Sequence, residues 1–334
     1  MRRSTYISND TVSLVEYKKA DDYFIYKNWL DTGTQNGFNG IHVTTFEDFQ
    51  AREIRQRFFA MILLVGSGEI IGAVGISPPE TEADLAIWIY SQYRRQGYGT
   101  SAFALATKYA VEVLGISELH AGSYQDNIGS QKILAACGFV PNPSGSIREK
   151  HYLSGADIIQ MDYLYKPIII RLATPEDAPA MAEVHMRSWE VAYKDIIPSE
   201  YIREKNSTRP DMWKKNLEEG QYPHRVILFE RKIIGIMCFG APQDHDVGED
   251  TWELHYIYLH PDYFRRGIGT QAMNYAFDSS KDLGKKLMNV WVLAENTSSI
   301  KFYEQCGFVA DGKNKTLDYG KLLDGIRMRK DMTK

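Results

Sequence analysis

Two short segments of this chain combine arginine and glycine in a pattern that suits phosphate binding. They are residues 93–100 (YRRQGYGT) and 263–270 (YFRRGIGT). Each segment follows a strand-like run and opens a helix-like run, so its backbone N–H groups carry partial positive charge and can bind a pyrophosphate. The glycines that let a ligand approach the backbone closely are Gly97, Gly99, Gly267 and Gly269.

A second motif follows each glycine loop and begins with an asparagine. It covers residues 127–139 and 296–308, and both copies end in Cys-Gly-Phe. Gly97 and Gly267 lie 170 positions apart, and Asn127 and Asn296 lie 169 apart. Because two motifs keep nearly the same offset, the chain reads as one domain duplicated, with predicted domains at 1–166 and 167–334.

Strands and helices alternate around the motifs in both halves, which predicts a mixed α/β fold. Helical spacing of apolar residues follows each glycine loop, and a short helix ending at glycine follows each asparagine. The predicted strands are 84–90, 119–123, 253–259 and 287–293, and the predicted helices are 102–114, 130–136, 272–283 and 299–305.

The composition is that of an ordinary soluble globular protein, with 44% hydrophobic and 25% charged residues and a net charge of −4. That charge gives no reason to expect nucleic acid binding, and no apolar run is long enough for a membrane helix. The three cysteines do not suit a disulfide framework. Cys137 and Cys306 therefore read as small buried residues. We expect a cytoplasmic protein without a bound metal.

The order strand, Arg-x-x-Gly-x-Gly, helix, strand, Asn-x-x-Ser, helix, Gly-Phe resembles the GNAT superfamily of acetyl-coenzyme A-dependent N-acetyltransferases. The resemblance occurs once in each half. It implies an α/β fold of two tandem GNAT-type domains, each with a mixed, mostly antiparallel central sheet flanked by helices. It also implies acetyl-CoA as co-substrate and the primary amine of a small molecule or peptide as acceptor.

The resemblance implies coenzyme-binding residues in both halves, because the family's loop amides bind the pyrophosphate and the preceding strand holds the pantetheine arm. In the second half these residues are Ile257, Leu259, Arg265, Arg266, Gly267, Ile268, Gly269, Thr270 and Asn296. In the first half they are Arg94, Arg95, Gln96, Gly97, Tyr98, Gly99, Thr100, Asn127 and Ser130. Phe264 replaces the arginine found at position 94, so we expect weaker coenzyme binding in the second half.

The second half, which resembles small general N-acetyltransferases, is expected to carry the chemistry. Tyr303 stands where the family has its usual general acid, and it would protonate the departing thiolate. The equivalent residue of the first half is Leu134. Glu253 is the candidate base, acting through water. Strand alternation predicts that Glu253, His255, Ile257 and Leu259 share one face, which makes His255 a second candidate base or a substrate-orienting group.

Two alternative functions and two further questions stay open at this point. The first half resembles acetyltransferases of ribosomal-protein N-termini, so it could acetylate a protein or peptide N-terminus. One half could instead be a non-catalytic acyl-CoA-binding or scaffold domain. Asp84 is the only acid on the first half's equivalent strand, and its spacing puts it one residue out of register with Glu253.

The acidic segment 244–250 is either a solvated loop or a lure for a cation. The chain could be a monomer or a homodimer.

Overall fold

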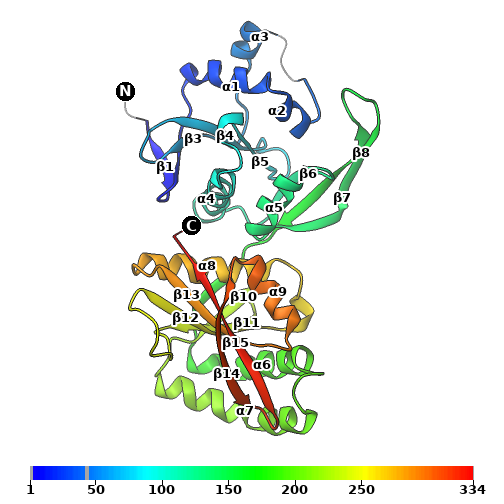
Figure 1. The fold of residues 1–334 in the computed structure, drawn as a ribbon. Coiled ribbons are helices and arrows are strands. Elements are labelled where there is room, and N and C mark those ends of the chain that lie inside the picture. The colour runs from blue at the N-terminus through cyan, green and yellow to red at the C-terminus, as the bar shows by residue number, and fades with distance from the viewer. Residues whose placement is uncertain (1–2, 42–44, 334) are drawn as a thin grey trace. The chain divides into compact units, whose positions relative to one another are not determined.

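A computed structural model describes residues 3–41 and 45–333 of the chain. The chain divides into two compact units, Met1–Pro167 and Ile168–Lys334. Within each unit, helices cover both faces of central β-structure that is mostly antiparallel (Figure 1). The predicted fold class is therefore confirmed.

The N-terminal unit contains two sheets. The first has five antiparallel strands in sequence order: β1 (Thr5–Ser8), β2 (Val12–Glu16), β3 (Phe58–Leu64), β4 (Ile70–Ile76) and β5 (Leu85–Ile89). The second has the order β6-β8-β7, with β6 at Leu119–Tyr124, β7 at Val140–Lys150 and β8 at Asp157–Tyr165. The helices are α1 (Asp22–Trp29), α2 (Thr32–Gly37), α3 (Phe46–Ala51), α4 (Tyr98–Glu112) and α5 (Ile128–Ala136).

Strand β5 separates two hydrophobic cores in this unit because its side chains alternate between the two faces of the sheet. Leu85, Ile87 and Ile89 belong to the core that includes the buried residues of α4. Trp88 faces the other way and packs in the core that includes Ile25 of α1. One face of β5 is thus covered by the helix that follows the glycine loop.

The C-terminal unit has one seven-stranded sheet, in the order β14-β15-β13-β12-β11-β10-β9. Its strands are β9 (Ile169–Leu172), β10 (Arg225–Phe229), β11 (Lys232–Gly240), β12 (Thr251–Leu259), β13 (Leu287–Leu293), β14 (Val309–Asp318) and β15 (Leu322–Asp331). Its helices are α6 (Ala178–Ala192), α7 (Ser199–Glu219), α8 (Ile268–Asp282) and α9 (Thr297–Gln305). The predicted strands and helices around both motifs are present, with ends that differ by a few residues.

Strands β12 and β13 are parallel neighbours for only part of their length. Their pairing runs from Thr251 opposite Leu287 to Leu254 opposite Val290, and beyond Leu254 the two strands diverge. In the N-terminal unit the corresponding strands β5 and β6 meet through a single parallel bridge, between Asp84 and His120. Each unit therefore has two strands that start together and then separate ahead of the glycine loop.

A β-bulge in β12 changes which of its side chains share a face. The register with β11 shifts between Cys238, which pairs with Tyr256, and Phe239, which pairs with Leu254, so His255 is the extra residue. Alternation restarts after the bulge. The prediction that Glu253 shares a face with Ile257 and Leu259 is therefore wrong. Those two residues pack in the core that contains Leu254.

The asparagine that opens each second motif is a helix cap. Asn127 accepts a hydrogen bond from the N–H of Ser130, and Asn296 accepts one from the N–H of Ser299, at 3.1 Å in both cases. Such a cap satisfies a backbone donor that the first helical turn would otherwise leave free. Asn296 is buried, so water cannot take over the bond when the side chain is removed.

We expect Asn296→Ala to lower the free energy of unfolding by about 1 kcal/mol, because the N-terminal cap of α9 is lost. Urea unfolding followed by tryptophan fluorescence measures this change. Asn314→Ala, at an exposed position of the same unit, is the matched control and should stay within about 0.5 kcal/mol of the wild type. Equal midpoints for the two variants would contradict the capping role.

Candidate functional site

The two glycine loops share one backbone conformation. Arg95 and Gly97 have φ angles of 65° and 83°, and Arg265 and Gly267 have 62° and 71°. Each loop thus has two residues in the left-handed region of backbone conformation before its helix begins, at Tyr98 in α4 and at Ile268 in α8. Glycine adopts this conformation at little cost, whereas arginine is strained in it. Such strain is common at ligand-binding loops.

The start of each of these helices offers free backbone donors. The first helical hydrogen bond in α4 runs from the N–H of Ser101 to the carbonyl of Gly97, and in α8 from Gln271 to Gly267. The N–H groups that precede Ser101 and Gln271 belong to the first turn, which leaves them available to an anion. Six residues of the two loop segments are also exposed to solvent: Arg95, Gln96, Gly97, Phe264, Arg265 and Arg266.

The second glycine of each loop packs against the helix of the asparagine motif. A Cβ atom on Gly99 would lie 3.0 Å from Ile133 of α5, and one on Gly269 would lie 3.1 Å from Phe302 of α9. Both contacts would be tighter than normal packing allows. In each unit the glycine loop therefore packs directly against the helix of the asparagine motif.

Arg94 makes protein contacts that hold the loop to α2. Its guanidinium donates hydrogen bonds of 2.8 Å to Asp31, to the hydroxyl of Thr34 and to the carbonyl of Ile89. Asp31 is itself the N-terminal cap of α2. Burial alone would raise the pKa of its carboxyl, but the hydrogen bonds from Arg94 and from the N–H of Thr34 together outweigh burial, and the pKa is lowered overall. The counterpart Phe264 is exposed. The first-position arginine thus ties the loop to a helix, and the second copy lacks that tie.

Glu253 is a buried carboxylate at the last paired segment of β12 and β13. It pairs with Gly240 on one side and with Asn289 on the other. Its Oε2 accepts a hydrogen bond of 3.0 Å from the N–H of Gln243, and its Oε1 lies 3.4 Å from Nδ1 of His255. His255 therefore lies beside Glu253, as expected, but the cause is the bulge and not regular strand alternation.

Tyr303 lies on α9 and is 7% exposed. It packs against Phe302 and Phe308, with ring centroids at 5.4 and 5.6 Å. Burial raises its pKa, with a further contribution from neighbouring Tyr258. The phenol therefore stays protonated at neutral pH and can act as a proton donor. In the N-terminal unit Leu134 on α5 is equally buried and offers no proton.

A group of aromatic residues surrounds Tyr258 of β12, on the face of the sheet covered by α6 and α7. His185 stacks on Tyr258 with a centroid distance of 4.6 Å, and Trp189 packs on Tyr193 at 5.2 Å. Burial, together with the nearby phenols, raises the pKa of Tyr193. Trp189 and Tyr193 are thus brought beside the central strand.

Sequence reasoning missed Arg209 of α7, whose guanidinium lies inside this aromatic group. It is 4% exposed, lies 4.2 Å from the ring of Trp189 and has its Nη1 2.7 Å from Nε2 of His185. Among the described residues it forms no ion pair with a carboxylate, and its Nη2 is buried without a hydrogen-bond acceptor. Burial lowers the pKa of His185 to about 2. The imidazole of His185 is therefore neutral. It adds no second positive charge, but it also cannot neutralise the charge of Arg209.

Two residues of the acidic segment 244–250 form ion pairs within the protein. Asp244 and Asp246 form ion pairs of 2.9 and 2.6 Å with Arg327, which is 3% exposed. Asp246 also contacts Lys313. The hydrogen bonds from Arg327 and Lys313 lower the pKa of Asp246. These charges are neutralised within the protein, so the segment gives no support for a cationic acceptor in this unit.

The cysteines are not activated as nucleophiles. Burial raises the pKa of Cys137 and of Cys306 to about 12. In the described part of the chain no group of three His, Cys, Asp or Glu side chains could hold a metal ion. No helix within residues 3–41 and 45–333 combines the length and apolarity needed to cross a membrane.

Comparison with known proteins gives a match in each half. Residues 14–140 match the model of an acetyltransferase (GNAT) domain, and residues 181–308 match that of the acetyltransferase (GNAT) family. An uncharacterised N-acetyltransferase of Bacillus subtilis, YuaI, is 32% identical over 139 residues, which are 41% of this chain and 78% of that protein. The L-amino acid N-acyltransferase MnaT of Escherichia coli is 26% identical over 46% of this chain and 88% of its own length.

Among solved structures, the PaiA N-acetyltransferase of Thermoplasma acidophilum in complex with coenzyme A aligns with a TM-score of 0.40. It is 23% identical, and the alignment covers 49% of this chain and 99% of that one.

We expect Arg94→Ala to lower the free energy of unfolding by about 1–2 kcal/mol, because three hydrogen bonds to a charged group are lost. Thermal unfolding measures the effect. Arg95→Ala is the matched control, since its side chain is exposed, and should change stability by less than about 0.5 kcal/mol. Weaker coenzyme binding by Arg94→Ala without any loss of stability would contradict this role. It would indicate a direct contact between Arg94 and the phosphates.

Proposed function

Because the chain belongs to the GNAT acetyltransferase family, with one family domain in each half, we propose that its C-terminal unit transfers an acetyl group from acetyl-CoA to a primary amine. One observation carries the choice of unit. Tyr303 is a buried phenol with a raised pKa at the position where the N-terminal unit has Leu134. Only the C-terminal copy of this motif offers a proton to a leaving thiolate.

The coenzyme sits at the glycine loop and along the diverging strand in this proposal. The first-turn N–H groups of α8 take the pyrophosphate, with Arg265 and Arg266 exposed beside it. Beyond Leu254, β12 has separated from β13, so the backbone of Ile257 and Leu259 can bind the pantetheine amides along that edge. Asn296 supports this arrangement as the cap of α9. In the N-terminal unit the same roles fall to residues 94–100, and Asn127 and Ser130 form the cap of α5.

The chemistry divides between two side chains. Glu253, acting through water, takes a proton from the acceptor ammonium, since only the free amine attacks the thioester carbonyl. As the carbon–sulfur bond breaks, the protonated Tyr303 gives its proton to the sulfur of coenzyme A. A backbone N–H of β12 stabilises the oxygen of the tetrahedral intermediate.

The acceptor that fits this unit carries an anionic group as well as its amine. Arg209 is a buried guanidinium without a carboxylate partner among the described residues, and an isolated buried charge is costly. A carboxylate of the acceptor would compensate that charge. MnaT, which is similar to this chain, is named an L-amino acid N-acyltransferase. An amino acid is therefore the acceptor class we propose.

We expect Tyr303→Phe to lower kcat by about 100-fold or more with an amino acid acceptor, since the general acid is removed. Coenzyme A binding, measured by calorimetry, should persist because the loop is unchanged. Tyr275→Phe, the same substitution at a more exposed position of α8, should leave kcat unaltered. Wild-type turnover in the Tyr303→Phe variant would refute the assignment of the general acid.

We expect Glu253→Gln to change the pH dependence of the rate as well as its size. Without the base, the reaction relies on the fraction of acceptor that is already deprotonated. That fraction rises with pH up to the pKa of the acceptor amine. The rate of the variant should therefore keep rising over a pH range in which the wild-type rate is level. Parallel pH profiles would show that Glu253 takes no part in proton removal.

A further inference from the structure

The loop between β11 and β12, residues 241–250, lies against the sheet beside Glu253. The N–H of Gln243 donates the hydrogen bond of 3.0 Å to Oε2 of Glu253. The next residue, Asp244, accepts a hydrogen bond of 3.0 Å from Nε1 of Trp291 on β13. The position of the loop therefore decides whether the Glu253 carboxylate keeps its backbone donor.

Arg327 of β15 holds this loop in place. Its Nη1 donates hydrogen bonds of 2.9 Å to Asp244 and 2.6 Å to Asp246, and its Nε donates one of 2.8 Å to Asp311 of β14. The side chain is 3% exposed, and a planar guanidinium with five donors in fixed directions can bind several carboxylates at once. Because Asp244 follows Gln243 directly, Arg327 fixes the peptide group that contacts Glu253.

Strand register places Arg327 and Glu253 on the same face of the sheet. Glu253 pairs with Asn289 of β13, and Trp291, two residues further along β13, pairs with Arg327. Paired residues of neighbouring strands share a face, as do residues two apart in one strand. Leu254, the residue after Glu253, packs on the other face in the core that includes α8. The loop thus covers the face that carries the carboxylate.

The two oxygens of Glu253 have different neighbours. Oε2 accepts from the N–H of Gln243, whereas Oε1 lies 3.4 Å from Nδ1 of His255. A hydrogen bond from an N–H group favours the ionised form of a carboxylate, which is the form that accepts a proton. It also fixes the directions in which the remaining lone pairs point. The contact with Gln243 therefore serves both the charge and the orientation that a base requires.

Asp84 of the N-terminal unit occupies the same position in its sheet as Glu253. Each of the two precedes a leucine that pairs with the neighbouring strand four residues after a glycine, Gly72 or Gly235. Spacing puts the two carboxylates one residue out of register, and His255 of the bulge is that residue. The register difference expected from the sequence is therefore wrong, and the two units can be compared at this point.

The counterpart of Arg327 in the N-terminal unit is an acid. Gly122 and Trp291 lie 169 positions apart, the same offset as the two asparagine motifs. Gly122 pairs with Asp162, and Trp291 pairs with Arg327. Asp162 therefore stands in its sheet where Arg327 stands in the other unit, and it has the opposite charge.

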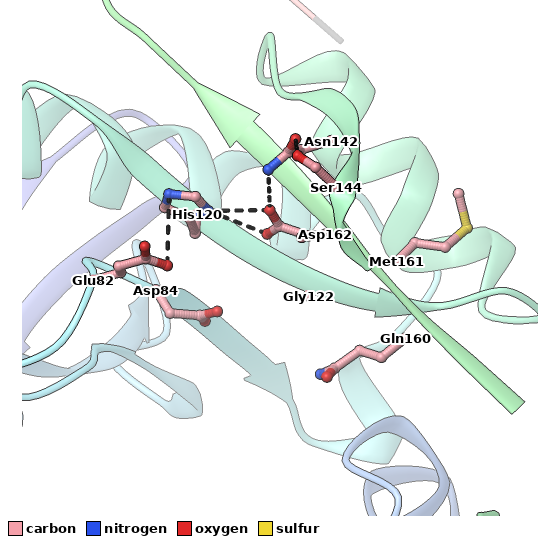
Figure 2. Close-up of a pocket in the computed structure, with 10 residues that line it drawn as sticks. Glu82, Asp84, His120, Gly122, Asn142, Ser144, Gln160, Met161 and Asp162 are labelled. Atoms are coloured by element: carbon pink, nitrogen blue, oxygen red, sulfur yellow. Dashed lines mark hydrogen bonds and ion pairs between the residues drawn. The ribbon is translucent and has the colours of Figure 1, made fainter. Parts of the chain in front are cut away.

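Asp162 makes a different set of contacts (Figure 2). It accepts a hydrogen bond of 2.7 Å from Nδ2 of Asn142 and lies 3.1 Å from Nδ1 of His120. These residues and Asp84 line a pocket of about 390 Å³. Within the described residues, no backbone N–H donates a hydrogen bond to the Asp84 carboxylate. The contact that fixes Glu253 thus has no counterpart at Asp84.

We propose that Arg327 is a positioning residue for proton removal by Glu253, and that it acts through the loop between β11 and β12. In the proposed reaction Glu253 gains, through water, the proton that leaves the acceptor ammonium. Arg327 keeps the N–H of Gln243 on Oε2, so the carboxylate stays ionised and oriented until that transfer. The inference rests on the proposed function of the C-terminal unit.

Arg327→Lys tests this role, since lysine keeps the charge but cannot bind three aspartates along the directions of a guanidinium. The probe is acetyl-CoA with an equimolar mixture of L-amino acids, without cysteine so that the thiol released is that of coenzyme A. We expect the rate of thiol release at about pH 7 to fall by about tenfold or more. Coenzyme A binding, measured by calorimetry, should match the wild type because the glycine loop is unchanged.

The pH profile separates positioning from a general loss of structure. Without its N–H donor the carboxylate is ionised only at higher pH, so the acidic limb of the rate profile should move to higher pH in Arg327→Lys. The other charged and titratable groups around Glu253 and the loop are the same in this variant: His255, Tyr222, His224, Arg329, Asp244, Asp246 and Asp311. A loss of folded protein would instead lower the rate equally at every pH.

A double-mutant cycle with Glu253→Gln shows whether Arg327 acts through Glu253. In that background Arg327→Lys should change the remaining rate by less than about twofold, since no base is left to position. Asp324→Asn, at an exposed position of β15, is the matched control. It should leave the rate unaltered in both backgrounds.

Asp244→Ala tests the same link with less effect on the fold. It removes the contacts to Trp291 and Arg327 but leaves Arg327 paired with Asp246 and Asp311. The rate should fall by at least about threefold when Glu253 is present and stay constant in the Glu253→Gln background.

Two results would overturn the inference. One is a wild-type rate and pH profile in both Arg327→Lys and Asp244→Ala, and the other is an equal loss with and without Glu253→Gln. Failure of the proposed function is a separate outcome. It would appear as an unchanged rate and pH profile in the Glu253→Gln single variant, in which the loop and Arg327 are intact.

Discussion

The structure of each unit depends on a parallel strand pair that ends early. Strands in a sheet normally satisfy each other's backbone donors and acceptors over their full length. Here β12 and β13 do so only as far as Leu254 and Val290, and β5 and β6 do so only at Asp84 and His120. The remaining edge of the central strand must find its hydrogen bonds in water or in a ligand. A ligand with amide groups, such as a pantetheine arm, can pair with that edge.

The carboxylates Glu253 and Asp84 and the two glycine loops are arranged around this divergence. Glu253 and Asp84 lie where the strands are still paired, so their backbones are fixed. The glycine loops lie at the opposite end of the diverging strand, where α4 and α8 begin. The copies differ in the elements attached to this frame. Arg94 ties one loop to α2, whereas Phe264 leaves the other without that tie.

The sequence was sufficient to predict the duplication, the fold class and the elements around each motif. Glycine at 97 and 267 and asparagine at 127 and 296 have local roles, as left-handed loop residues and helix caps, and local roles leave a clear sequence pattern. The bulge could not be predicted, because a single additional residue such as His255 leaves no mark in a strand of apolar and aromatic residues. The pairing of His120 with Asp162 was also hidden. These residues come from different strands of a small sheet, and no spacing rule relates them.

The His255 bulge also determines how the two copies can be exchanged for each other. An extra residue in a regular strand would turn every later side chain to the opposite face. The bulge absorbs it locally, so Tyr256 and Tyr258 take the places of Ala86 and Trp88 while Leu254 keeps the place of Leu85. A chimera that grafts β5 into the C-terminal unit must therefore be one residue shorter than the strand it replaces. A graft aligned by residue count alone would turn the side chains on one side of the bulge to the opposite face of the sheet.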